Sequence, residues 1–381
     1  MVTKLRPLAA LLTVIGTLVM PAASASAPSP LLLGLFDDAV TLDPAVDNFP
    51  LLQSLHVQVV RITLTWGGPG GVANKQPEHP ADPSDPAYNW ARYDEAVERA
   101  NGAGIQLLLT IIGTPSWANG GKSPQYAPTS PGTLRAFAYA AAQRYSGTFL
   151  DTASGRVLPR VGLWLAWNEP NNPVFLQPQF TRVNGAWQME AAAAYARICN
   201  AVYAGVHAAG GPEQVACGAT APRGNNNPTT ARPSITPLAF LRAAKKLGLR
   251  TFDAWADHPY YGNPADTPAT RNLGSAIELG NIGKLVSVVT DLYGDKPIWI
   301  TEYGYQTNPP DTFFGVSWER QAQYLRQAYD IARANPRIGL FTWFLLKDNP
   351  SLSAWQSGLM TADGQKKPSF ATFAGLRAES L

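Results

Sequence analysis

The sequence predicts a single (β/α)8 TIM barrel, and three observations support that fold class. Short apolar segments alternate with longer helical segments eight times along the chain, as expected when each barrel strand is followed by a helix. Most of the strand segments are continuous apolar runs, which is typical of parallel strands covered on both faces. A doubly wound sheet would need a glycine-rich phosphate turn after its first strand, and the GLFDD sequence at residues 34–38 does not supply one.

The individual elements are assigned from apolar spacing and from the residues that interrupt it. Strands are expected over residues 31–36, 57–66, 105–112, 161–167, 215–219, 252–257, 297–301 and 338–345. Helices follow these segments, and glycines such as Gly104, Gly210 and Gly248 end several of them. They are expected over residues 45–55, 90–103, 131–145, 186–209, 237–247, 277–292, 318–334 and 368–377.

The composition excludes some function classes. Only 15% of the 381 residues are charged, compared with about 25% in an average protein, and the formal net charge is +3. Nucleic-acid-binding proteins normally present a basic face, so no nucleic-acid partner is expected. The length alone would allow two domains of about 150 residues, but barrels of this size fold as one domain. The 11 Trp, 33 Gly and 33 Pro suit long, ordered loops.

The N-terminus predicts a secretory signal peptide over residues 1–27, followed by one barrel domain over residues 28–381. Lys4 and Arg6 precede an apolar run at residues 8–20, and the small residues at 23–27 offer cleavage positions. A membrane anchor is the alternative, but the run is shorter than the roughly 20 residues that a span needs. No cysteine follows the run to carry a lipid. We therefore expect a secreted monomer with no membrane partner.

The two cysteines, Cys199 and Cys217, fall in a predicted helix and in the strand that follows it. Export makes a disulfide possible, but sequence order does not fix the separation of the two residues. A disulfide and two buried free thiols therefore both remain open. Two cysteines without clustered histidines make a poor metal site, so no metal is expected.

Two of the apolar strands end in a glutamate. Glu169 follows the fourth predicted strand and Glu302 follows the seventh, and they are two of only ten glutamates in the chain. Active sites of these barrels lie at the carboxyl ends of the strands, where both carboxylates would face the same mouth. Burying a carboxylate costs several kcal/mol unless it is paired, so two such strand ends indicate a site. The alternative is that each glutamate is a buried salt-bridge partner.

A facing pair of carboxylates is the arrangement used for glycoside hydrolysis. A separation of about 5 Å suits a double displacement, with one acid/base and one nucleophile, whereas about 6.5–9.5 Å suits inversion. The sequence does not measure that separation.

The motifs around both glutamates resemble those of the retaining glycoside hydrolases of clan A. WNEPN at residues 167–171 matches the acid/base motif of the clan, and ITEYG at residues 300–304 matches its nucleophile motif. The resemblance covers essentially the whole chain after the signal peptide. In motif it is closest to family 39 and its exopolysaccharide-hydrolase relatives, then to family 5. The resemblance implies that Glu169 is the acid/base, that Glu302 is the nucleophile, and that no cofactor is needed.

The same resemblance implies roles for four polar neighbours. Arg61 in the second strand would help to hold the negative charge of Glu302, and Asn168 would hydrogen-bond the sugar 2-hydroxyl. His258 and Tyr260 follow the sixth strand. His258 would orient the site or contact the acid/base, and Tyr260 would hydrogen-bond the nucleophile. The alternatives are a structural ion pair for Arg61, a turn role for Asn168 and a structural histidine.

Aromatic residues at other strand ends are candidate sugar platforms, because indoles and sugar C–H faces are both flat and apolar. Trp343, in the eighth strand, is the expected floor for the sugar beside the scissile bond. Trp66, Trp117 and, in the last loop, Trp355 could line subsites. Packing within the loops is the alternative for these side chains.

These features predict a secreted retaining glycoside hydrolase that cleaves a β-linked poly- or oligosaccharide, with endo action favoured. Two alternatives remain open. The first is an exo-β-glycosidase of the β-xylosidase kind, because long loops could form either an open cleft or a closed pocket. The second is a non-catalytic carbohydrate-binding barrel that uses the aromatic mouth without turnover.

Overall fold

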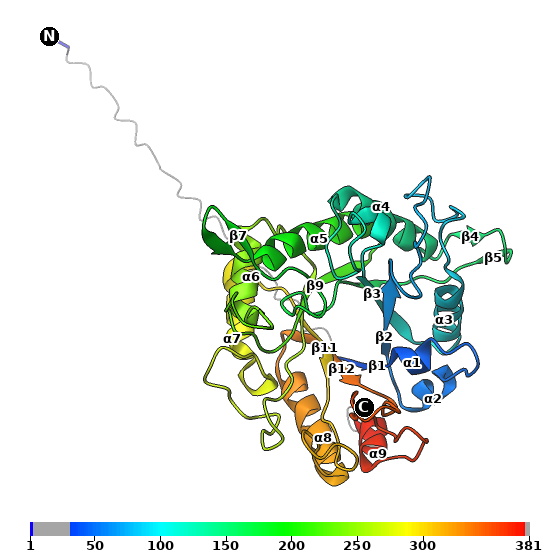
Figure 1. The fold of residues 1–381 in the computed structure, drawn as a ribbon, viewed down its shortest axis with the longest axis vertical. Helices are drawn as coiled ribbons and strands as arrows, with labels where there is room; N and C mark the ends of the chain where they lie inside the picture. The colour runs from blue at the N-terminus through cyan, green and yellow to red at the C-terminus, as the bar shows by residue number, and fades with distance from the viewer. Residues whose placement is uncertain (3–30, 378–381) are drawn as a thin grey trace.

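The predicted fold class is confirmed by a closed barrel of eight parallel strands in a computed structural model, which describes residues 1–2 and 31–377 (Figure 1). Around the barrel the strands follow the order β1-β12-β11-β10-β9-β6-β3-β2. Their bounds are β1 Leu32–Phe36, β2 Val59–Thr65, β3 Gln106–Ile112, β6 Leu163–Ala166, β9 Gln214–Thr220, β10 Ala254–Asp257, β11 Ile298–Tyr303 and β12 Ile338–Phe344.

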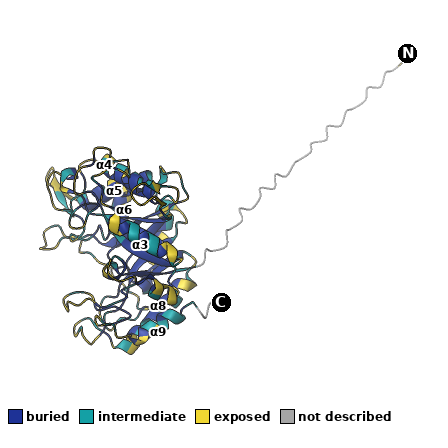
Figure 2. Cartoon of the chain, turned by 90° about the vertical axis from the view of Figure 1, so that its right-hand side faces the viewer, coloured by how far each residue is buried: buried dark blue, intermediate teal, exposed yellow. Residues whose placement is uncertain are grey.

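Helices surround the barrel and cover the outward faces of its strands, and Figure 2 shows buried residues concentrated where helices and strands meet. The main helices are α2 Phe49–Ser54, α3 Ala91–Gly102, α4 Pro131–Arg144, α5 Glu190–His207, α6 Pro237–Lys246, α7 Gly283–Tyr293, α8 Trp318–Ala334 and α9 Pro368–Gly375. The short elements are α1 Asp38–Thr41 and the 3-10 turns η1 Ser116–Ala118 and η2 Leu279–Asn281.

Two small hairpins lie outside the barrel, and one of them corrects a predicted helix start. β4 Leu150–Asp151 pairs with β5 Arg156–Val157, and β7 Thr181–Val183 pairs with β8 Ala186–Gln188. The expected helix over residues 186–209 therefore begins later, at Glu190. The reason is the Asn184-Gly185 turn, whose φ angles of 50° and 81° suit a tight hairpin better than a helix.

The alternation of side chains along each strand divides the core into two parts. Outward-facing residues join the large cluster between strands and helices, which includes Val60, Ile62 and Leu64 of β2. Inward-facing residues fill the barrel itself, and this smaller cluster contains Val59, Leu108, Leu163, Leu165, Ala216, Ala219, Ala254, Ala256, Trp299 and Leu340. The side of a strand on which a residue falls thus decides whether it can reach the barrel mouth.

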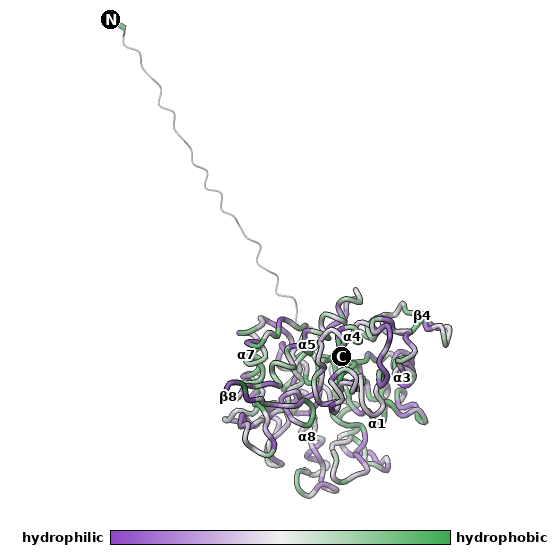
Figure 3. Tube along the Cα trace, turned by 45° about the horizontal axis from the view of Figure 1, so that its top comes forward, coloured by the Kyte–Doolittle hydropathy of each residue, from purple (hydrophilic) through white to green (hydrophobic). Residues whose placement is uncertain are grey.

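The predicted signal peptide falls mostly on residues 3–30, which lie outside the described residues. Within the described part of the chain, no helix combines the length and the apolar character needed to cross a membrane. Figure 3 shows hydrophobic and hydrophilic residues interspersed along this part of the trace.

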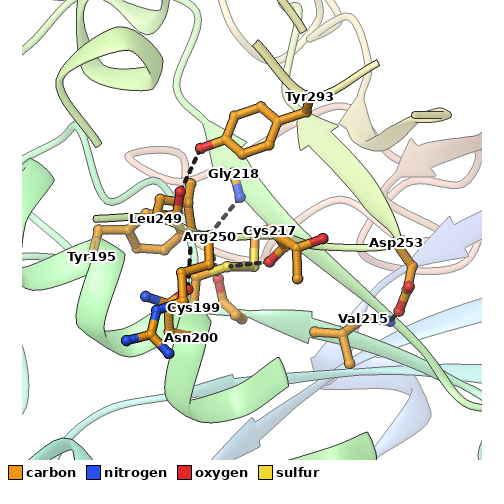
Figure 4. Close-up of a disulfide and its surroundings, with 12 residues drawn as sticks. Tyr195, Cys199, Asn200, Val215, Cys217, Gly218, Leu249, Arg250, Asp253 and Tyr293 are labelled. Atoms are coloured by element: carbon orange, nitrogen blue, oxygen red, sulfur yellow. Dashed lines mark hydrogen bonds between the residues drawn. A yellow bond between two sulfur atoms is a disulfide. The ribbon is translucent and has the colours of Figure 1, made fainter. Parts of the chain in front are cut away.

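Cys199 of α5 and Cys217 of β9 form a disulfide, with their Cα atoms 5.9 Å apart (Figure 4). Both residues are fully buried, and β9 runs directly alongside the helix that precedes it. This resolves the choice between a disulfide and free thiols. It also ties the long helix α5 to the barrel wall on the side of Glu169.

Replacing both cysteines by alanine is expected to lower the free energy of unfolding by about 3 kcal/mol, because the bridge closes a loop with a sequence separation of 18. Urea unfolding of the wild type and of the double variant measures this difference. The matched control is the wild type under reducing conditions, which should unfold like the double variant. Equal unfolding midpoints for the oxidised wild type and the double variant would contradict this expectation.

Candidate active site

The two strand-end glutamates meet at the mouth of the barrel. Glu169 follows β6 and Glu302 lies in β11, and both line one cavity of about 710 Å³. A carboxylate oxygen of Glu169, one of Glu302 and a ring nitrogen of His258 all lie within 4.8 Å of one another. The side chains of the two glutamates are 13% and 10% exposed, so each is largely buried but open to the cavity. Their position makes them a pair that could act on one bond.

Arg61 connects most of the predicted site residues, because it faces inward on β2 in the floor of the cavity. Its Nη1 donates to Oε1 of Glu302 at 2.7 Å, and its Nη2 donates to Oδ1 of Asn168 at 2.6 Å. Its Nε donates to the Thr110 hydroxyl at 2.9 Å, and the guanidinium lies 4.3 Å from the Phe36 ring centroid. The guanidinium thus fixes Glu302 and Asn168 and compensates one buried negative charge.

Replacing Arg61 by Met is expected to lower the free energy of unfolding by about 3–5 kcal/mol, because it leaves Glu302 buried without its cation. Chemical denaturation measures the loss. The double variant Arg61→Met/Glu302→Gln should recover part of it, since the uncompensated charge is then gone as well. Strictly additive effects of the two substitutions would show that the ion pair does not couple these residues.

Glu169 has the surroundings of a carboxyl group that keeps its proton to a higher pH than a free glutamate does. Burial raises its pKa from 4.5 to about 6, against the opposing effects of the Asn172 hydrogen bond and of the Arg61 and Arg223 charges. Its Oε2 accepts from the Asn172 side chain at 2.9 Å, and its Oε1 lies 3.1 Å from Nδ1 of His258. Asn172, three residues after Glu169, was not among the predicted site residues.

His258 is a neutral neighbour of both carboxylates. Burial lowers its pKa to about 3, with the attraction of Glu302 opposing and the Arg61 charge assisting. Nη1 of Arg61 lies 3.2 Å from Nε2 of His258 and can only donate, so Nε2 accepts and Nδ1 carries the hydrogen. Nδ1 therefore donates to Glu169. The structure thus places His258 against the predicted acid/base.

Tyr260 and Asn168 also lie where the sequence placed them. The Tyr260 hydroxyl donates to Oε2 of Glu302 at 3.1 Å, and burial raises the pKa of Tyr260, which keeps the hydroxyl a donor. Asn168 lines the cavity with its Oδ1 held by Arg61. Glu302 therefore has a fixed donor on each oxygen, and Asn168 has a fixed orientation at the cavity surface.

The aromatic residues are the part of the predicted site that the structure corrects. Trp343 is fully buried, belongs to the outer core cluster and donates to the Ser357 carbonyl at 3.1 Å. Trp66 is also fully buried and packs on Phe137 with ring centroids 5.6 Å apart. Neither lines the cavity. Both face outward because they alternate with the inward-facing residues of β2 and β12.

Trp117 does not reach the cavity either. Its indole nitrogen donates to the Ala73 carbonyl at 2.8 Å, and its ring packs against Trp66 at 5.8 Å. These loop contacts hold it beside the barrel, away from the two glutamates.

Other aromatic side chains line the cavity instead. Phe344, the inward neighbour of Trp343, lies 5.2 Å from Phe36 and 5.4 Å from Trp355 between ring centroids. Trp355 is 38% exposed and also packs on Tyr260 at 5.0 Å. Together with Phe175 of the loop after β6 they form the aromatic part of the cavity lining. Strict two-residue alternation along the eighth strand was the signal that could have identified Phe344.

Glu169, His258 and Glu302 are also the residues that could meet a cation, because their ligand atoms converge. Arg61 already supplies a positive charge to Glu302 at 2.7 Å, and Nε2 of His258 faces the same guanidinium. The arrangement therefore suits a reaction in which one glutamate is ionised and the other protonated.

Two glutamates that face each other across the mouth of a (β/α)8 barrel form the arrangement that two-carboxylate glycosidases use. Residues 275–373, which include Glu302, match the family model described as the glycosyl hydrolase catalytic core. The match covers about a quarter of the chain and includes strand β11, which carries Glu302. A comparison with curated proteins finds no significant match.

Solved structures with the same fold come from several glycoside hydrolase families. A family 39 glycoside hydrolase from the gut symbiont Bacteroides cellulosilyticus WH2 is 19% identical with a TM-score of 0.61, over 92% of this chain and 64% of that one. A glucosidase from Croceicoccus marinus is 14% identical with a TM-score of 0.64, over 92% and 67%. A family 39 β-xylosidase from Caulobacter crescentus is 18% identical with a TM-score of 0.56, over 92% and 71%. The chain thus spans less than two thirds of the Bacteroides protein.

Proposed function

We propose that this protein is a retaining glycosidase that hydrolyses β-linked O-glycosidic bonds by double displacement. The observation that carries the proposal is the approach of Glu169 and Glu302, whose nearest oxygens together with His258 lie within 4.8 Å. Retaining enzymes separate their carboxyl groups by about 5–5.5 Å, whereas inverting enzymes leave about 6.5–9.5 Å for a water.

In the first step Glu302 attacks the anomeric carbon and the bond to the leaving oxygen breaks. Donors from Arg61 and Tyr260 hold the attacking carboxylate in place, at 2.7 and 3.1 Å. Glu169 gives its proton to the leaving oxygen, so the aglycone departs as an alcohol. The products of this step are a glycosyl ester on Glu302 and an ionised Glu169.

In the second step a water replaces the ester. Ester formation has removed the negative charge of Glu302, which favours the ionised form of Glu169. Glu169 then takes a proton from the water as the water oxygen attacks the anomeric carbon and the bond to Glu302 breaks. Both glutamates return to their initial states, and the sugar keeps its original anomeric configuration.

Proton NMR of the first product tests this mechanism directly. A β-glycoside should release the β anomer first, before mutarotation produces the α anomer. Early appearance of the α anomer would indicate inversion and would overturn the proposed role of Glu302 as nucleophile.

Endo action stays a prediction, with an exo-β-glycosidase as the competing mode. A reduced, β-linked oligosaccharide separates the two, because its end groups are distinguishable. Endo action should release shorter oligosaccharides from internal positions from the first minutes. Release of monosaccharide alone throughout the reaction would instead establish the exo mode.

We further propose that the protein is exported and that its signal peptide is removed after residue 27. The basic residues followed by an apolar run and small residues support this proposal. N-terminal sequencing of the protein from the culture medium should begin near residue 28. Retention of the intact N-terminus in a membrane fraction would count against it.

A further inference from the structure

The cavity extends beyond the two glutamates toward the end of β1, where Asp38 forms part of its wall. Residues from the loops after β1, β6 and β12 line it, and Thr63 of β2 lies between Arg61 and Asp38. None of the predicted site residues lies at the β1 end of the cavity. The polar groups at this end therefore have no assigned role.

The orientation of Asp38 is fixed by β2. The Thr63 amide donates to its Oδ1 at 2.9 Å. Thr63 is two residues after Arg61 on the same face of β2, which places it about 7 Å further toward the mouth. Among the described residues Asp38 forms no ion pair at 4.0 Å or less, although the Arg61 and Arg92 charges attract it from further away. The half-buried carboxylate thus keeps acceptor capacity on the side of the cavity.

Two neighbouring acidic residues of this wall accept hydrogen bonds from backbone amides of the protein. Oδ2 of Asp37 accepts from the amides of Leu346 and Lys347 at 3.2 and 3.0 Å. Oδ1 of Asp43 accepts from the Ala45 amide at 2.8 Å. Asp37 joins β1 to the loop after β12, and Asp43 shapes its own loop. Asp38 instead accepts from β2, through the Thr63 amide.

The position of Asp38 also indicates which part of the substrate it meets. The leaving group must lie beside Glu169, after β6, because Glu169 protonates its oxygen. The transferred sugar lies over Glu302 of β11. Strand β1 is separated from β11 only by β12, whereas β2 and β3 separate it from β6. Asp38 therefore belongs to the side of the transferred sugar.

We propose that Asp38 is a specificity-determining residue that accepts hydrogen bonds from hydroxyls of the transferred sugar. This inference rests on the proposed glycosidase function and deepens it, because it assigns the substrate a hydroxyl-bearing sugar at this end. A carboxylate is an acceptor only, and hydroxyl groups are the donors that a neutral sugar offers. A sugar that lacks the matching hydroxyl leaves this acceptor unpaired.

The test compares Asp38→Asn with the wild type on the best-cleaved member of a panel of p-nitrophenyl β-glycosides. The substitution keeps the acceptor for the Thr63 amide but exchanges the second acceptor for a donor. A loss of about 10- to 100-fold in kcat/KM is expected, as for a hydrogen bond to a charged group. Asp47→Asn is the matched control, because Asp47 accepts the Phe49 amide in the same loop but does not line the cavity.

Monodeoxy versions of that substrate distinguish recognition from a structural role. In the wild type, removal of the hydroxyl that Asp38 binds should cost about as much as the substitution. In Asp38→Ala, removal of the same hydroxyl should cost nothing further, whereas the other deoxy positions keep their usual effects. Thermal unfolding of each variant verifies that it is folded.

Unchanged kcat/KM in Asp38→Asn, or additive losses at every deoxy position, would overturn the role of Asp38. A wild type that cleaves no glycoside of the panel or of a polysaccharide set would instead count against the proposed function. The two failures are therefore distinguishable.

Discussion

Replacing Glu302 by Ala is expected to abolish hydrolysis, with a loss of about 10⁴-fold or more in kcat/KM, because the group that attacks the anomeric carbon is removed. The substitution also deletes a buried carboxylate that Arg61 contacts at 2.7 Å and Tyr260 at 3.1 Å. Thermal unfolding should therefore accompany the rate measurement, so that a lost nucleophile is not confused with a lost fold.

Azide provides the decisive arm of this experiment. The cavity left by the side chain admits a small anion, which can attack the anomeric carbon from the same face as the missing carboxylate. Azide should restore activity to Glu302→Ala on an activated aryl β-glycoside and give the α-glycosyl azide. Near-normal turnover of the variant without azide would show that Glu302 is not the nucleophile.

The sequence was sufficient to find most of the polar part of the site, but not Asn172, which contacts Glu169. Glu169 and Glu302 could be identified because each ends a buried strand, and the closed barrel brings all strand ends to one mouth. For these two residues the cost of a buried charge agreed with the topology. Arg61 was placed by the resemblance to clan A, and the structure puts it beside Glu302.

The aromatic part was harder to predict, because an apolar side chain can be buried on either face of a barrel strand. Trp343 and Trp66 pack outward, and Phe344 takes the place at the cavity that was expected for Trp343. Neither face imposes a burial penalty on an aromatic side chain. Only the alternation of residues along each strand therefore decides whether the side chain faces the cavity or the helices. Asp38 was missed for another reason, because it begins the short helix α1 after β1 and its contact with Thr63 depends on strand pairing.

Replacing Glu169 by Gln should produce a loss that depends on the leaving group. The amide cannot protonate the departing oxygen, and general acid catalysis typically contributes about 10²- to 10⁴-fold. Natural oligosaccharides, whose leaving alcohols are weak acids, should show the full loss. A dinitrophenyl glycoside needs little protonation, so its bond to Glu302 should form at close to the wild-type rate. A pre-steady-state burst of dinitrophenolate measures this step.

The pH profile gives an independent test of the same residue. Glu169 must be protonated in the free enzyme, and burial raises its pKa to about 6. In the wild type, kcat/KM for an oligosaccharide should therefore follow a bell-shaped profile whose basic limb falls as pH rises through about 6. Glu169→Gln carries no titrating group at this position, so its basic limb should disappear. Equal losses on all leaving groups, with the basic limb intact, would assign the proton to another residue.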